Sequence, residues 1–184
     1  MKLIIVRHGQ SNYNVQRKIN FLPTKECHLT ELGMQQAYEV KEQLKEKKWD
    51  IAIVSELYRT QQTAAIINED RNIPLFIDEK INEIKTGIEG QSYDEYRAQL
   101  EEDDEVLRRD KALPNGESYD QVKARIRTFL SELKTKNYSS VLIVTHFTPM
   151  IALRQVLEEQ SDAESVQYRP ANAEIMEAEL TKSF

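Results

Sequence analysis

Short apolar segments alternate with longer amphipathic segments along this chain, and this alternation limits the folds that the chain can adopt. The apolar segments have strand character and occupy residues 2–6, 51–54, 75–77 and 141–145, with a weaker one at 173–180. Between them, apolar side chains such as Ala37, Val40 and Leu44 recur at helical spacing. Strands that alternate with helices favour a mostly parallel sheet with helices on both faces. We therefore expect an α/β protein, a three-layer α/β/α sandwich.

Capping residues indicate where several helices begin. They are Thr30, Ser55, Ser118 with Gln121 in a capping-box pattern, and Thr148 as N-cap before Pro149 as first helical residue. The region 87–113 fits the alternation poorly, because it is polar and contains the acidic run Glu101–Glu105. We expect a helical lid there, with the acidic run as a solvated helix face.

Length and charge exclude several classes of protein. The 184 residues suit one domain, 1–184, and the net charge of −6, from 25 basic and 31 acidic residues, argues against a nucleic-acid binder. Cys27 is the one cysteine, so no intrachain disulfide can form and a reducing compartment is favoured. The first apolar run is too short for a signal peptide or a transmembrane helix, so we expect no membrane partner and a cytoplasmic location. Oligomeric state cannot be predicted from this sequence.

Two of the three histidines directly follow predicted core strands. Arg7, His8 and Gly9 come after the first strand, and His146 comes after the strand at 141–145. Because ligands of open α/β sheets bind beyond the carboxyl ends of the strands, these side chains are expected to meet at one edge. A cation and a potential nucleophile would then lie where an anion docks.

The motifs that contain these residues resemble those of the histidine phosphatase superfamily, which includes the phosphoglycerate mutases. The matching segments, in order, are Arg7-His8-Gly9-Gln10-Ser11 with Asn14, Leu29-Thr30-Glu31-Leu32-Gly33, the segment 55–64 with Arg59, Asn82-Glu83-Ile84 with Glu89-Gly90, the segment 114–118, and Val144-Thr145-His146. The resemblance extends from residue 3 to about residue 180 and implies a phosphoglycerate mutase-like fold.

The resemblance also implies roles for particular residues. His8 would be the nucleophile that becomes a phosphohistidine, Arg7 and Arg59 would clamp the phosphoryl oxygens, and His146 would be a second, cationic histidine. Glu83 would protonate the leaving group and then act as base on the water that hydrolyses the phosphohistidine.

The resemblance also assigns Asn14 and Gln10 to phosphate binding, with Asn14 as a hydrogen-bond donor. Glutamine at position 10 is one of the residues that the family uses there. No cofactor and no metal are implied.

Phosphate-monoester chemistry explains these residue types without the family. Arginine offers a planar fork of donors that matches phosphate bidentately, and neutral imidazole is a competent nucleophile. The role that the resemblance gives Glu83 requires a carboxyl group that holds a proton when the substrate binds. Gly9 is expected to let the backbone pass close to the anion. The chain offers no recognisable metal-ligand spacing.

The chain departs from the family pattern at two places. Phe147 follows His146 where glycine is usual, and the segment after Asn14 lacks the Gly-Trp element of cofactor-dependent mutases. We therefore predict a metal-independent phosphomonoesterase that acts on a small phosphorylated molecule. The alternatives are a cofactor-dependent phosphoglycerate mutase and a non-catalytic module that binds a phospho-ligand. Four side chains are candidates to meet the non-phosphate part of the substrate: Lys18, Phe21, Tyr93 and Arg97.

Overall fold

In the computed structural model, residues 1–100 and 110–181 are described, and five strands in this part form one sheet. The strands are β1 (Lys2–Arg7), β2 (Ile51–Val54), β3 (Leu75–Ile77), β4 (Ser140–Thr145) and β5 (Ile175–Glu179), in the spatial order β3-β2-β4-β1-β5. The pairs β1–β4, β2–β4 and β2–β3 are parallel, and β5 runs antiparallel to β1. The expected mostly parallel sheet is therefore confirmed, with an antiparallel strand at one edge.

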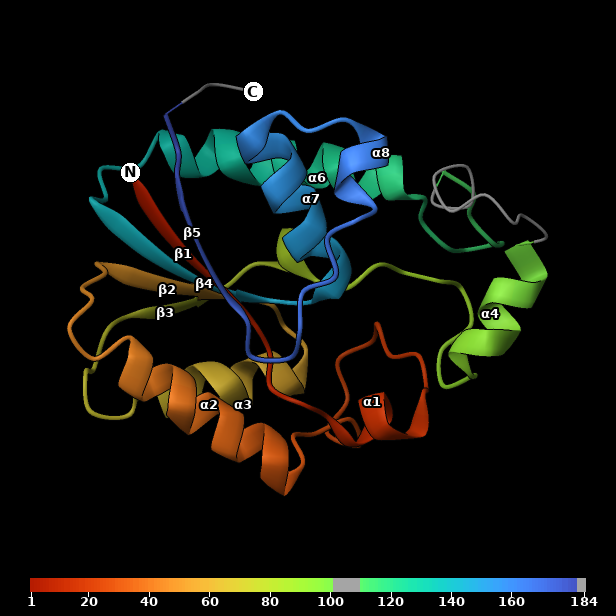
Figure 1. Ribbon diagram of the computed structural model, residues 1–184, viewed down its shortest axis with the longest axis horizontal. Helices are drawn as coiled ribbons and strands as arrows, with labels where there is room; N and C mark the ends of the chain where they lie inside the picture. The colour runs from red at the N-terminus through yellow and green to blue at the C-terminus, as the bar shows by residue number, and fades with distance from the viewer. Residues whose placement is uncertain (101–109, 182–184) are drawn as a thin grey trace.

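Helices cover both faces of this sheet (Figure 1). The helices α2 (Glu31–Gln43) and α3 (Tyr58–Asn68) pack on one face, and α6 (Tyr119–Lys134) and α7 (Phe147–Glu158) pack on the other. Successive side chains of a strand point to opposite faces, so Leu3 and Ile5 join the core under α6 and α7, whereas Ile4 and Val6 join the core under α2 and α3. Burial of both faces explains why β2 and the middle of β1 and β4 are apolar, and the three-layer architecture is confirmed.

Shorter elements connect these layers: α1 (Asn12–Gln16), the 3₁₀ helix η1 (Glu79–Ile81), α4 (Tyr93–Leu100) and α8 (Asp162–Ser165). In Figure 1, α1 and α4 lie beyond the carboxyl ends of the strands. The helix α4 belongs to the region expected to form a lid, while the acidic run Glu101–Glu105 lies outside the described residues. Within the described part of the chain, no helix is long and apolar enough to cross a membrane.

Two of the predicted helix starts are confirmed and two are wrong. Thr30 caps α2 by accepting the Gly33 N–H at 3.0 Å, and Ser118 begins α6 in a capping box. However, α3 begins at Tyr58 rather than just after Ser55, because the Ser55 hydroxyl is engaged elsewhere in the core.

The helix α7 begins at Phe147, so Thr148 is already helical. The backbone N–H groups of Phe147 and Thr148 donate to the carboxylate of Glu83, at 3.2 Å each. A carboxylate distant in sequence therefore satisfies this helix start, and Thr148 is not needed as a cap.

Gly9 allows a close approach of two backbones. A Cβ built on Gly9 would lie 2.3 Å from the carbonyl oxygen of Gly33, and one built on Gly33 would lie 2.0 Å from the carbonyl oxygen of Gln10. The contact that excludes a side chain at Gly9 is thus with α2. Packing against α2 therefore explains the glycine at this position, whereas the sequence analysis expected glycine to let the backbone approach an anion.

Candidate active site

The sheet brings His8 and His146 together. His8 directly follows β1 and His146 directly follows β4, and the parallel register pairs Arg7 with Thr145. The two imidazole rings are 5.1 Å apart between centroids, with an interplanar angle of 62°. Both residues are almost completely buried, at 2% and 0% exposure. Histidines far apart in the sequence therefore form an edge-to-face pair at the carboxyl edge of the sheet.

The hydrogen bonds of His8 define which nitrogen carries the proton. Its Nδ1 lies 2.7 Å from the carbonyl oxygen of Gly9, which can only accept, so Nδ1 donates. Its Nε2 lies 3.0 Å from Nε of Arg59, which can only donate, so Nε2 accepts. The Nε2 atom of His8 consequently carries a lone pair, as a nucleophile requires.

The surroundings of both histidines favour the neutral imidazole. Burial lowers the pKa of His8 and of His146 well below the usual value of 6.5, and the positive charges of Arg59 and Arg7 lower both further. The cationic form of His146 that the resemblance implies stays a prediction. The positive charge around the two histidines comes from the guanidinium groups.

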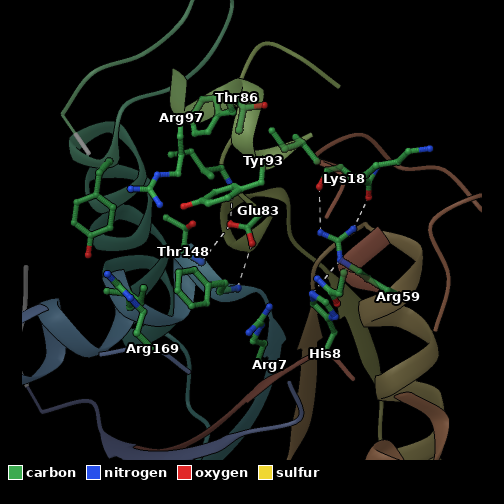
Figure 2. A pocket seen from close by; sticks show the side chains of 18 of the residues that line it. Arg7, His8, Lys18, Arg59, Glu83, Thr86, Tyr93, Arg97, Thr148 and Arg169 are labelled. Atoms are coloured by element: carbon green, nitrogen blue, oxygen red, sulfur yellow. Dashed lines mark hydrogen bonds between the residues drawn. The ribbon is translucent and has the colours of Figure 1, made fainter. Parts of the chain in front are cut away.

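Arg59 is held rigidly at the beginning of α3. Its Nη1 donates to Oδ1 of Asn20 and, at 3.5 Å, to Sγ of Cys27, while its Nη2 donates to the backbone oxygen of Asn20 at 3.1 Å. With Nε directed at His8, the guanidinium is anchored on several sides (Figure 2). Its orientation is thus set before any ligand binds.

Arg7 lies above the ring of Phe147, with Cζ at 5.1 Å from the ring centroid. One of its terminal nitrogens donates to the backbone oxygen of Pro170 at 2.7 Å. Its Nε is buried and has no hydrogen-bond partner within the described residues. The phenylalanine at the position where glycine was expected therefore provides a cation–π contact that supports Arg7.

Glu83 follows η1, and its carboxylate lies at the N-terminus of α7. Oε2 accepts the N–H of Phe147, and Oε1 accepts the N–H groups of Thr148 and of Ile84, the last at 2.9 Å (dashed lines to Glu83 in Figure 2). Negative charge is favourable at a helix N-terminus, so these contacts fix the carboxylate in place. Oε2 accepts only one of these bonds, which leaves a lone pair able to take a proton.

These side chains border a cavity of about 500 Å³. Its lining includes Arg7, His8, Asn14, Arg59 and Glu83, which the sequence analysis had assigned to one site. His146 is not part of the lining and lies in contact with the His8 ring.

Gln10 is also outside the lining, because its side-chain oxygen accepts from the Thr30 hydroxyl at 2.9 Å. Asn14 is in the lining, and its Oδ1 accepts from the backbone N–H of Ser11 at 2.9 Å. That bond leaves the amide nitrogen of Asn14 as the end that can donate to a ligand.

The remaining lining residues surround the space above the histidine. Lys18, Tyr93 and Arg97 are among them, as expected for side chains that meet the leaving group, whereas Phe21 is not. The sequence analysis missed other members, namely Ile19, Asn20, Ile84, Thr86, Tyr96, Leu100, Tyr119, Thr148, Ile151 and Arg169. The helical spacing of Tyr93, Tyr96 and Leu100 in α4 was the available signal that they share a face.

The cavity is strongly cationic although the chain is acidic. Five of its lining residues carry a positive charge and one, Glu83, carries a carboxylate: the cations are Arg7, Lys18, Arg59, Arg97 and Arg169. Such a surface suits an anion, and arginine in particular suits phosphate. No cluster of three or more potential metal ligands occurs within the described residues.

Comparisons with known proteins agree with this chemistry. The family model described as histidine phosphatase superfamily (branch 1) matches residues 3–183. Phosphoserine phosphatase 1 of Hydrogenobacter thermophilus is 31% identical over 161 residues, which cover 83% of this chain and 74% of that protein. A 2,3-bisphosphoglycerate-dependent phosphoglycerate mutase of Methylobacterium is 33% identical over 168 residues, which cover 85% of this chain and 80% of that protein. The structure of mycobacterial glucosyl-3-phosphoglycerate phosphatase in complex with VO3 has a TM-score of 0.82 and 26% identity, and the match covers 96% of this chain and 91% of that one.

Proposed function

The chain belongs to the histidine phosphatase superfamily, and we propose that it hydrolyses phosphate monoesters through a phosphohistidine formed on His8. The observation that carries this proposal is the unprotonated Nε2 of His8, which lies at 3.0 Å from Arg59 at a cavity rich in positive charge. A nucleophile and the groups that neutralise a phosphate are thus adjacent. Phosphatases among the relatives support the same activity.

In the first step, the lone pair on Nε2 of His8 attacks phosphorus. The N–P bond forms while the bond between phosphorus and the ester oxygen breaks, and protonated Glu83 gives its proton to that oxygen. Arg7 and Arg59 stabilise the negative charge on the phosphoryl oxygens in the transition state. The alcohol leaves, and Glu83 is left as a carboxylate.

In the second step, the Glu83 carboxylate accepts a proton from a water molecule as the water oxygen attacks phosphorus. The N–P bond breaks, the electron pair returns to Nε2 of His8, and inorganic phosphate leaves. Glu83 is protonated again and His8 is neutral, so the enzyme is ready for another turnover. No step requires a metal ion or a cofactor.

The substrate is a small phosphorylated molecule whose leaving group occupies the outer part of the cavity. Lys18, Tyr93, Arg97 and Arg169 line the cavity in addition to the phosphate-binding groups, and the first three support the expectation that they meet the leaving group. Four residues of α4 line the cavity, which supports the prediction that 87–113 acts as a lid within a single domain. A cytoplasmic location stays a prediction.

The test is a phosphatase screen over a panel of phosphorylated metabolites with the wild type and His8→Asn. We expect phosphate release by the wild type alone, and an acid-labile phosphoryl group on His8 in protein quenched during turnover. Phosphoryl exchange between monophosphoglycerates that needs a bisphosphate primer would instead identify a mutase, as in the Methylobacterium relative. Binding of phosphate esters without turnover would identify a binding module and contradict the proposal.

A further inference from the structure

Ser55 lies where the ends of two core strands meet. It directly follows β2, and its backbone N–H donates to the carbonyl oxygen of Val144 in β4 at 3.2 Å. Its side chain is fully buried, and its Oγ is 2.7 Å from Nε2 of His146. Ser55 does not cap α3, so its burial beside a histidine of the site needs another explanation.

The direction of each hydrogen bond at Ser55 follows from its partners. Oδ1 of Asn82 accepts the backbone N–H of Glu56 at 3.1 Å, so this atom is the oxygen of the amide. Oγ of Ser55 lies 2.7 Å from the same oxygen and must donate its single proton to it. Oγ also accepts the backbone N–H of Leu57 at 3.2 Å. The bond to His146 can therefore only be accepted by Ser55, so Nε2 of His146 carries a proton.

His146 packs against His8 rather than lining the cavity itself, and its other nitrogen is not engaged by Ser55. Nδ1 is buried and has no hydrogen-bond partner within the described residues. The ring to which it belongs packs edge to face against His8, and the positive charges of Arg59, Arg7 and Arg125 act on it. Nδ1 is thus the nitrogen of His146 able to take a second proton and donate it in a hydrogen bond to a phosphoryl oxygen.

We propose that Ser55 is a positioning residue for phosphoryl transfer: its hydroxyl, oriented by Asn82, keeps Nε2 of His146 protonated, so that Nδ1 takes up a second proton from the surrounding water when the anionic phosphoryl group binds and then donates to it. The inference rests on the proposed function of the site. The two histidines are held in opposite tautomers, because Gly9 places the proton of His8 on Nδ1 and Ser55 places that of His146 on Nε2.

The hydrogen bond between Ser55 and Asn82 also links His146 to the segment that carries Glu83. Asn82 directly precedes Glu83, and its side chain ties this segment to the end of β2 through Ser55 and Glu56. Its backbone oxygen accepts from Arg125 at 2.8 Å. Ser55 therefore fixes the second histidine relative to the proposed general acid, and its loss is expected to affect turnover more than folding.

The tautomers can be measured directly in protein labelled with ¹⁵N-histidine. The chain has three histidines, so His8→Asn and His28→Asn variants assign every signal. At neutral pH we expect His146 to be protonated on Nε2 in the wild type and to gain a population protonated on Nδ1 in Ser55→Ala. A wild-type His146 protonated on Nδ1, or no change in Ser55→Ala, overturns the proposal. This measurement does not depend on activity, so it is separate from a failure of the proposed function.

Kinetics provide the second readout. Ser55→Ala is expected to lower kcat/KM by about tenfold to a hundredfold, the effect of losing a buried hydrogen bond to a charged group. Ser55→Thr keeps the hydroxyl and is expected to restore the tautomer and most of the rate. The matched control is Ser165→Ala, which removes a buried hydroxyl bonded to the backbone oxygen of Asp162 at 2.9 Å in α8 and leaves both readouts unchanged. An equal loss in Ser165→Ala would assign Ser55 a merely structural role.

Discussion

Acid should destabilise this protein through its two buried histidines. Burial, reinforced by Arg59 and Arg7, lowers the pKa of both His8 and His146 well below 6.5 in the folded chain. Above pH 6.5 neither state binds these protons, and below it the unfolded chain binds them while the folded chain does not. At neutral pH the two buried, neutral histidines therefore reduce the stability of the fold very little. The free energy of unfolding falls as the pH drops below the histidine pKa of the unfolded chain and towards the lower pKa of the folded chain.

The size of this effect follows from linkage. A histidine with an unfolded pKa near 6.5 that stays neutral in the folded state costs about 0.2 kcal/mol at pH 7 and about 2 kcal/mol at pH 5. The free energy of unfolding should therefore fall by nearly 2 kcal/mol for each histidine, or about 4 kcal/mol for the pair, over these two pH units. Such a loss is a large fraction of the stability of a typical domain.

Urea denaturation at pH 7 and pH 5 measures the effect. Carboxylates also contribute to acid sensitivity, so the informative quantity is the difference in unfolding free energy between the wild type and His8→Asn. We expect this difference to shift by nearly 2 kcal/mol in favour of the variant between pH 7 and pH 5. The exposed His28 provides a matched replacement, His28→Asn, outside the cavity. A difference for His8→Asn that is the same at both pH values would refute the reasoning.

Three further predictions concern the cavity. Arg59→Lys should lower kcat/KM by about a hundredfold or more, because lysine cannot contact His8, Asn20 and the phosphoryl oxygens together; activity close to wild type in a steady-state assay would contradict the role of the guanidinium. Phe147→Leu removes the ring beneath Arg7 and should raise KM about fivefold with a smaller effect on kcat, which an unchanged KM would disprove. Excess EDTA should leave phosphate release unaltered, and inactivation by the chelator would exclude the metal-free mechanism.

The hydrophobic pattern specified most of the fold before any tertiary contact was known. The bounds of β2 and β3 match the apolar runs in the sequence. Every residue of β2 is buried, so β2 must be apolar on both faces, whereas the apolar residues of the edge strand β3 are exposed. The capping box at Ser118 was readable because both partners lie within one turn. These features depend on residues that are close in the chain.

The starts of α3 and α7 show where such reasoning fails. Ser55 and Thr148 are both suitable N-caps, yet Ser55 is engaged by His146 and Asn82, and Glu83 satisfies the first N–H groups of α7. In each case the competing partner comes from a distant part of the chain. Local preference predicts a cap only where no stronger partner from elsewhere is available.

The sequence by itself determined the strands, the layers and the residue types that meet at the carboxyl edge of the sheet, since periodicity and motif order are local properties. Only the tertiary structure decided which nitrogen of each imidazole carries the proton, that Phe147 supports Arg7, and that Gln10 lies outside the cavity. The physical reason is that a hydrogen bond's direction and a ring's neighbour depend on distances of a few ångströms between elements far apart in the chain, which no local pattern encodes.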